Sequence, residues 1–186
     1  EALGIAHVEA RAEELLRAGA EAGHGAASAY LARWALERHD PPGVVVAHLA
    51  RGAKDGDAEA IHMLADAHLS GEFGLPVDHT RAFNMYMLAG ANGEPAGYLS
   101  AGAMVLDTKR FELDATAAVG LNGTRSAARA VELYQLAADA GSVEAWSRLA
   151  DLYEDGPVGV PRDVEAAKRI RRFLRDVEGQ GAGHTG

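Results

Sequence analysis

Apolar residues recur every three or four positions in short segments of the chain, and most of these segments end at a glycine. The apolar residues of 60–68 fall on one face of a helix, and those of 82–89 do the same. Gly71, between them, suits the left-handed backbone that ends a helix, and Pro76 prevents the first helix from continuing. The pattern therefore predicts two helices joined by a short loop, which is a helical hairpin.

The loop of this hairpin occurs twice in the chain. Residues 70–82 read SGEFGLPVDHTRA and residues 155–167 read DGPVGVPRDVEAA, with glycine, proline, aspartate and alanine at matching positions. In the first copy, Asp78 is expected to cap the second helix by accepting a hydrogen bond from one of its first backbone N–H groups. Because the loop recurs together with the apolar segments on both sides, we expect the hairpin itself to recur.

Glycines at the helix ends give the period of the repeat. Gly23, Gly56, Gly93 and Gly141 lie 33, 37 and 48 residues apart, and such intervals are typical of helical-hairpin repeats with variable loops. The sequence predicts an all-α fold, a right-handed α/α solenoid of about 3.5 hairpins. The expected units are a half unit at 7–23, hairpins at 24–56, 57–93, 94–141 (with an insert at 107–125) and 142–175, and a flexible tail at 179–186.

This arrangement resembles the Sel-like repeat family, a relative of the tetratricopeptide repeats. The family pattern is roughly A-x-x-x-L-G-x-x-Y-x-x-G, then G-V-x-x-D, then A-x-x-W/Y-x-x-A-A-x-x-G. The matching residues are Ala60, Leu64, Ala65, Gly71, Gly74, Leu75, Asp78, Ala82, Tyr86, Ala89 and Gly93 in one hairpin, and Ala145, Leu149, Ala150, Tyr153, Gly156, Gly159, Val160, Asp163 and Ala167 in another. His68 and Arg171 stand where the family has aromatic residues. The resemblance implies an α-solenoid that holds other proteins. The signature residues of the family are structural, and no catalytic residue is carried over from them.

Composition narrows the classes of function. The chain has 186 residues, is 48% hydrophobic and carries a formal net charge of −9, which argues against general nucleic-acid binding. It contains no cysteine, so disulfides, thiolate metal sites and cysteine nucleophiles are excluded. No apolar run approaches the ~18 residues of a membrane-spanning helix. The compartment stays open, and the first residue, a glutamate, is compatible with a removed targeting or signal peptide.

Motifs for catalysis, metals and cofactors are absent from the sequence. Eight histidines occur, but none forms HxxxH or HExxH, and there is no P-loop, G-x-S-x-G or G-x-G-x-x-G. His68 is expected in the core with its ring hydrogen-bonded, and Trp34 is expected in the core because it aligns with apolar residues of the other hairpins. We therefore expect no catalytic residue, metal or cofactor. An enzyme with an unrecognised active site is the alternative.

By analogy with tetratricopeptide stacks, the first helices of the hairpins are expected to line a concave face that binds a protein or peptide. The outward positions of these helices are apolar in the middle and acidic at one end. The partner-binding residues expected there are Arg33, Leu36, His62, Asp66, Leu69, Leu99, Leu106, Ser147 and Asp151. The alternative is an ordinary solvent-exposed face with scattered leucines. On the first interpretation the chain is an adaptor or a structural subunit of a larger complex.

Two further segments are candidates for contact with a partner. In the insert 107–125, Phe111 and Leu113 could anchor in a partner, or the insert could be a tolerated excursion of the chain. The basic segment 168–175, KRIRRFLR, could meet an acidic protein surface or anionic lipid, so peripheral membrane association is a second alternative function. The other interpretation of 168–175 is that it gives polar cover to a terminal helix.

Overall fold

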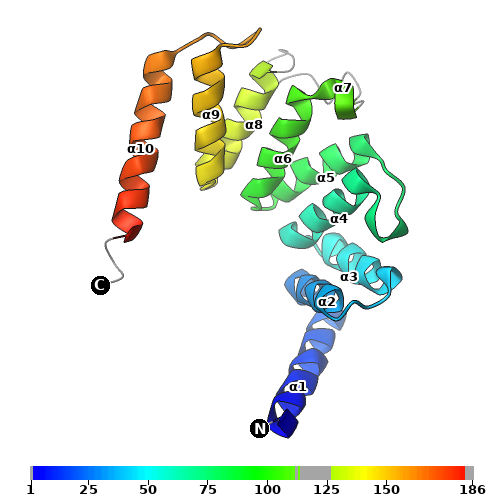
Figure 1. Cartoon of the computed structure of the whole chain (residues 1–186). Coiled ribbons are helices and arrows are strands. Elements are labelled where there is room, and N and C mark those ends of the chain that lie inside the picture. The colour runs from blue at the N-terminus through cyan, green and yellow to red at the C-terminus, as the bar shows by residue number, and fades with distance from the viewer. Residues whose placement is uncertain (1, 112, 114–126, 183–186) are drawn as a thin grey trace. The chain divides into compact units, whose positions relative to one another are not determined.

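The computed structural model describes residues 2–111, 113 and 127–182. All regular structure in these ranges is helical, which confirms the predicted all-α class (Figure 1). The helices are α1 (Ala2–Glu21), α2 (Gly25–Glu37), α3 (Pro42–Lys54), α4 (Ala58–Ser70), the short 3₁₀ helix η1 (Glu72–Gly74), α5 (His79–Ala91), α6 (Pro95–Leu106), α7 (Thr108–Phe111), α8 (Ala127–Asp139), α9 (Val143–Asp155) and α10 (Val164–Ala182). The chain divides into two compact units, Glu1–Glu94 and Pro95–Gly186, which we call unit 1 and unit 2.

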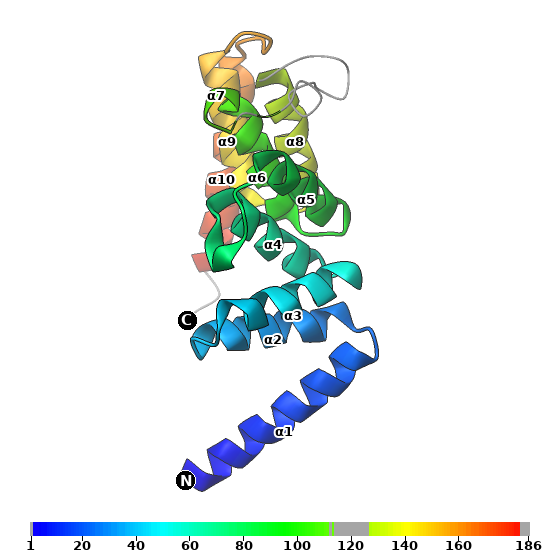
Figure 2. The ribbon, with the colours of Figure 1, turned by 90° about the vertical axis from the view of Figure 1, so that its right-hand side faces the viewer.

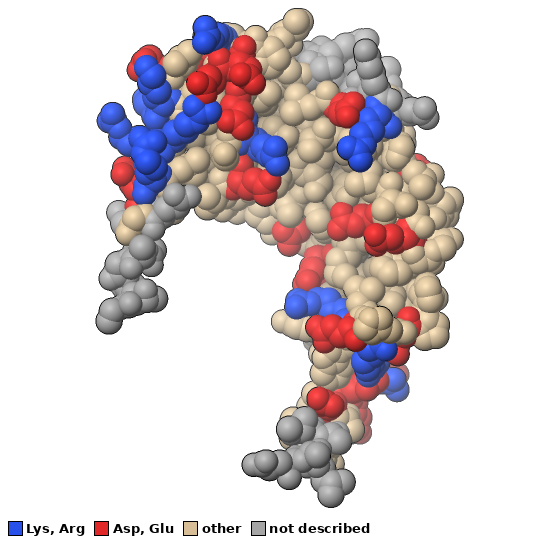
Figure 3. Space-filling model, in the orientation of Figure 1, with Lys and Arg blue, Asp and Glu red and all other residues tan. Residues whose placement is uncertain are grey.

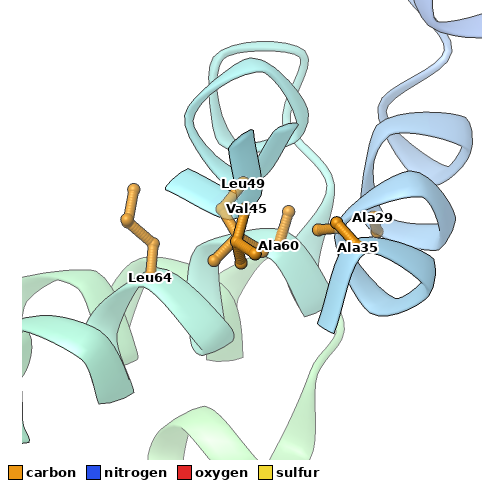
Figure 4. Close-up of a cluster of buried hydrophobic side chains, with 7 residues drawn as sticks. Ala29, Ala35, Val45, Leu49, Ala60 and Leu64 are labelled. Atoms are coloured by element: carbon orange, nitrogen blue, oxygen red, sulfur yellow. The ribbon is translucent and has the colours of Figure 1, made fainter. Parts of the chain in front are cut away.

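Unit 1 consists of two stacked hairpins and one additional helix. Helices α2 and α3 form the first hairpin and α4 and α5 the second; α3 packs against α4, and α1 packs against α2 (Figure 2). The core cluster drawn in Figure 4 joins three of these helices. Its buried members are Ala29, Ala32, Ala35, Val45, Leu49, Ala60 and Leu64. Most of them are alanines, so the helices approach each other closely.

One glycine of unit 1 is needed for this close approach. A Cβ atom on Gly52 of α3 would lie only 2.7 Å from the Cβ of Ala60 on α4 and 3.2 Å from the carbonyl oxygen of Gly25 on α2. Real Cβ atoms essentially never come within 3.0 Å of a neighbour. The contact between the two hairpins of unit 1 therefore depends on the absence of a side chain at residue 52.

Unit 2 repeats the hairpin with different spacing. Helices α6 and α8 form one hairpin and α9 and α10 another, and α8 packs against α9. Met104 and Val105 of α6, Leu133 of α8 and Leu149 of α9 are buried almost completely. The insert expected at 107–125 begins with α7, and residues 114–126 lie outside the part of the chain that is described.

The two copies of the repeated loop have the same local structure. In the first, the side chain of Asp78 accepts a hydrogen bond from the backbone N–H of Arg81 at 2.8 Å, and in the second Asp163 accepts one from Ala166 at 2.8 Å. The helix before each loop ends at a left-handed glycine, Gly71 with φ 76° and Gly156 with φ 60°. These observations confirm the predicted cap at Asp78 and the predicted role of Gly71.

A backbone hydrogen bond ties each loop copy to the preceding helix. The N–H of Asp78 donates to the carbonyl of His68 at 2.9 Å, and the N–H of Asp163 donates to that of Tyr153 at 2.8 Å. His68 is buried, and its ring nitrogen Nδ1 lies 3.4 Å from the carbonyl oxygen of Pro76. The histidine thus occupies the position of the aromatic in the other copy, as the sequence predicts for a core residue.

The structure differs from two expectations in detail. Helix α10 continues to Ala182, so residues 179–182 of the predicted tail are helical, while 183–186 lie outside the described residues and the flexibility of the tail stays a prediction. Glycine in an exposed helix costs only about 1 kcal/mol relative to alanine, too little to end a helix by itself. Trp34, expected in the core, is only half-buried and lines a pocket between α1 and α2.

Candidate protein-binding surfaces

In unit 1, two of the predicted binding residues of α4, His62 and Asp66, belong to a hydrogen-bonded group. The buried Tyr86 of α5 donates its hydroxyl to Asp66 Oδ1 at 2.5 Å, and His62 Nδ1 lies 3.4 Å from the other carboxylate oxygen. The rings of His62 and Tyr86 are 5.1 Å apart between centroids. Burial, together with the hydrogen bond to Asp66, raises the pKa of Tyr86 above its ordinary value. Asp66 is therefore held in place while about half of its side chain stays accessible.

The predicted residues of α2 are placed differently from one another. Arg33 is exposed; it pairs with Glu59 at 3.3 Å and its guanidinium lies 5.8 Å from the ring centroid of Tyr30. Leu36 is half-buried and packs against the core cluster of unit 1, and Leu69 of α4 is also half-buried. In unit 1 the accessible predicted residues are thus polar, whereas Leu36 contributes mainly to packing.

The Tyr86 hydroxyl gives a first prediction. Tyr86→Phe is expected to lower the free energy of unfolding by about 2 kcal/mol, because a hydrogen bond to a charged group is lost and Asp66 is left with one donor fewer. Urea denaturation measures the change. Tyr153→Phe is the control, because Tyr153 is half-buried and has no hydroxyl hydrogen bond among the described residues. Equal losses from both variants would contradict the assignment.

The same tyrosine sets the sign of a pH dependence. Because folding raises the pKa of Tyr86 above the ordinary value of 10.0, the neutral phenol is favoured in the folded state. Its contribution to stability is complete below pH 10 and is lost as the pH rises above that value. The stability of the wild type should therefore fall more steeply above pH 10 than that of Tyr86→Phe.

Unit 2 has a pocket on its first helices, α6 and α9. The pocket has a volume of about 290 Å³. It is lined by Leu99, Ser100 and Ala103 of α6, Tyr134 of α8, and Glu144 and Arg148 of α9. Arg148 and Glu144 form an ion pair at 2.9 Å, and this pair raises the pKa of Arg148. An apolar wall of α6 thus faces a charged pair of α9.

The other residues predicted for unit 2 lie close to the pocket residues along the chain, but their side chains differ in exposure and in pairing. Leu106 is 42% exposed, and Ser147 is exposed. Asp151 is exposed but accepts a hydrogen bond from Arg171 at 3.0 Å. Phe111 is half-buried, and the guanidinium of Arg110 lies 5.0 Å from its ring centroid. Of the predicted residues here, Leu99 lines the pocket of about 290 Å³.

The sequence did not indicate Tyr134, Glu144 or Arg148 as site residues. Glu144 and Arg148 are four residues apart on a helix, a spacing that usually means a solvent-exposed ion pair. The sequence pattern placed Tyr134 on the apolar, core-facing side of its helix. The pocket forms only because three segments that are distant in sequence come together, which no single segment indicates.

The basic segment 168–175 lies on α10, where Lys and Arg gather over this helix in Figure 3. Several of its cations are paired: Lys168 with Glu165 at 2.9 Å, Arg169 with Asp163 at 4.0 Å, and Arg171 with both Asp151 and Glu154. These pairs lie within unit 2 and neutralise much of the segment. Their geometry fits the interpretation of α10 as a helix with polar cover.

Among the described residues there is neither a candidate membrane-spanning helix nor a side-chain cluster suited to a metal ion. No helix among residues 2–111 and 127–182 combines the length and apolarity that crossing a membrane demands. In the described part of the chain, histidine, aspartate and glutamate side chains nowhere gather in threes that could hold a metal ion.

Comparison with known proteins identifies related repeats. The family model of the Sel1 repeat matches residues 2–24, 58–94, 117–142 and 144–169. The first match covers α1, and the others cover hairpins or parts of them. Residues 25–57, which form α2 and α3, are not matched, although the structure shows a hairpin there. No curated protein matches the chain.

Solved structures show the same fold at low sequence identity. A crystal structure of a Sel1 repeat protein from Oxalobacter formigenes aligns with a TM-score of 0.70 and 21% identity, over 89% of this chain and 63% of that one. The protein c5321, a protective antigen present in uropathogenic Escherichia coli strains and displaying an SLR fold, aligns with a TM-score of 0.70 and 23% identity. That alignment covers 88% of this chain and 33% of c5321. The chain thus spans less than two thirds of either structure.

Proposed function

The chain belongs to the Sel1 repeat family, and we propose that it is a non-catalytic protein-binding module, acting as an adaptor or as a structural subunit of a larger complex. Sel1 repeats are in general protein–protein interaction modules. In this chain, the first helices of the hairpins provide the binding surface. The observation that carries the proposal is the pocket of unit 2, which places an apolar wall beside a charged pair on two first helices.

The chemistry of this pocket suits a protein side chain. Leu99 and Ala103 can pack against an apolar group, while Glu144 and Arg148 at the rim can accept and donate hydrogen bonds. Ligand pockets in proteins are mostly apolar with a few placed polar groups, and protein interfaces enclose such anchors within a polar rim. Leu106, Ser147 and Asp151 extend the proposed surface along α6 and α9, and Phe111 extends it to α7.

Two titratable groups of the pocket, Tyr134 and Arg148, support a binding role over catalysis. A general base works best with a pKa near the operating pH. Burial instead raises the pKa of Tyr134, and the ion pair with Glu144 raises that of Arg148. Both changes move these groups further from neutral pH. We therefore assign neither Tyr134 nor Arg148 a role as a general acid or base.

Unit 1 contributes a polar surface of its own in this proposal. Arg33, His62 and Asp66 are held by neighbouring side chains, so their orientation is largely fixed before a partner arrives. Fixed groups lose less conformational entropy on binding than free ones. Leu36 and Leu69 lie at the edge of this surface and support it through packing. We propose hydrogen bonding and charge as the contribution of unit 1, and apolar contact as that of unit 2.

The test is a capture experiment with a matched pair of variants. Leu99→Glu places a charge in the pocket of unit 2, and Leu88→Glu places the same charge on α5, a second helix where Leu88 is 50% exposed. The wild type and both variants are immobilised, incubated with native lysate, and their bound proteins are identified by mass spectrometry.

We expect one or more proteins to bind equally to the wild type and to Leu88→Glu. The amount of these proteins bound to Leu99→Glu should be at least tenfold lower. Burying an unpaired carboxylate in an apolar contact costs several kcal/mol, which exceeds that factor. Partners bound equally by all three chains would contradict a binding role for the pocket. A thermal melt of each variant confirms that it is folded.

A further inference from the structure

We propose that the pocket between α1 and α2 is a second binding site, which takes an arginine side chain of a partner protein between the indole of Trp34 and the carboxylates of Glu9 and Glu37. The pocket has a volume of about 370 Å³ and lies within unit 1. It is lined by Glu9, Ala10 and Glu13 of α1 and by Trp34, Glu37 and Arg38 of α2. This site is separate from the first-helix pocket of unit 2, and neither proposal depends on the other.

The charges around the pocket leave an excess of acid. Arg38, the one cation of the lining, donates to Glu13 at 2.8 Å and to Asp40 at 3.0 Å. Glu13 is also paired with Arg17 at 2.6 Å. The two hydrogen bonds raise the pKa of Arg38, so its guanidinium stays charged and engaged. In the lining, Arg38 and Glu13 are therefore paired with each other and with neighbouring charges, and two further carboxylates, those of Glu9 and Glu37, remain.

Those two carboxylates carry the electrostatic part of the inference. Among the residues that the structure describes, Glu9 and Glu37 make no ion pair and no side-chain hydrogen bond. They come from opposite walls of the pocket, one from each helix. A cation that enters the pocket therefore meets unpaired negative charge on two sides.

Trp34 adds a second and independent feature. Trp34 is half-buried rather than fully buried and lines the pocket beside the small Ala10, so part of its indole is accessible from the pocket. The face of an indole attracts a cation within about 6 Å more strongly than any other aromatic side chain does. Its N–H makes no hydrogen bond among the described residues and remains available as a donor.

The combination of ring and carboxylates selects arginine among the natural cations. A guanidinium is planar, so it can stack on an indole while its N–H groups donate to a carboxylate in the same plane. An ammonium can make the charge contact but not the stacking contact. An uncharged side chain of the same planar shape can stack and donate N–H groups, but it lacks the positive charge that strengthens both contacts. These differences define the probes that test the site.

The experiment uses the whole chain labelled with ¹⁵N and follows the two indole N–H signals, with that of Trp34 assigned by its loss in Trp34→Phe. The probes are Nα-acetyl-arginine amide and Nα-acetyl-citrulline amide, which has nearly the same shape without the charge. The expected result is a saturable shift of the Trp34 signal with the arginine probe and at least tenfold weaker binding of the citrulline probe. The Trp146 signal should not move.

The double variant Glu9→Gln with Glu37→Gln removes two negative charges and keeps the size of the side chains. Its control is Glu21→Gln, which changes an exposed glutamate of α1 outside the pocket lining. The double variant is expected to bind the arginine probe about tenfold more weakly, and Glu21→Gln is expected to bind it as the wild type does. Equal binding of the two probes, or an unchanged affinity in the double variant, would overturn the proposal. The capture result with Leu99→Glu is unaffected by either outcome, so failure here is distinguishable from failure of the proposed function.

Discussion

Gly156→Ala is expected to lower the free energy of unfolding by about 3 kcal/mol. The residue ends α9 with φ 60°, a conformation that costs an L-residue about 1–2 kcal/mol. In addition, the new Cβ would lie 2.5 Å from the Cβ and 2.9 Å from the Cα of Arg162, and relieving such a contact costs typically about 1–3 kcal/mol. The Cα is backbone in the repeated loop, so it cannot move without disturbing the loop.

Gly141→Ala is the control for this substitution in the same unit. Gly141 also has positive φ, 99°, but nothing lies within 4 Å of the position of a new Cβ. The control therefore carries a conformational cost without the collision. Urea denaturation monitored by circular dichroism gives both values. A loss at Gly156 no larger than the conformational cost alone, about 1–2 kcal/mol, would show that Arg162 does not confine residue 156, and the description of the loop would then be wrong.

The second large effect is expected at Gly102, where α6 meets α8. A Cβ on Gly102 would lie 2.5 Å from Cε1 and 2.8 Å from Cδ1 of Tyr134, whose ring is buried. Alanine is a better helix former than glycine by about 1 kcal/mol, but the collision outweighs this gain because a buried ring has little room to move. Gly102→Ala is expected to destabilise the chain by about 2 kcal/mol.

Gly179→Ala provides a control of the opposite sign. Gly179 is an exposed residue of α10 with nothing within 4 Å of a new Cβ, so alanine should stabilise by up to about 1 kcal/mol through helix propensity alone. The double variant Gly102→Ala with Tyr134→Leu should lose less stability than the sum of its parts, because the ring that causes the collision is gone. Strict additivity would contradict direct contact between residues 102 and 134.

The repeated loop could be predicted because its determinants are local. Gly71 and Asp78 act within a few residues of their own position, through backbone conformation and a cap, so their roles follow from residue type and spacing. The same reasoning holds for Gly156 and Asp163. These four residues define where the helices of two hairpins end and begin, and thereby the fold class.

Features that depend on how helices pack could not be predicted in the same way. The contact of Gly102 with Tyr134 depends on the rotation and separation of two helices that are joined through the long insert. Trp34 matched a core position of the repeat, but the residues of α1 that line the pocket with it, Glu9, Ala10 and Glu13, are small or polar and leave a pocket. The candidate sites are therefore a property of packing, whereas the hairpins are a property of local sequence.

Hydroxyl-radical footprinting of the chain bound to a captured partner tests the central claim most directly, because it reports the accessibility of individual side chains. The account predicts that Leu99 and Leu106, on a first helix, lose reactivity in the complex, while Leu88, on a second helix, keeps it. Protection of Leu88 with unchanged reactivity of Leu99 and Leu106 would contradict the claim that the first helices bind the partner.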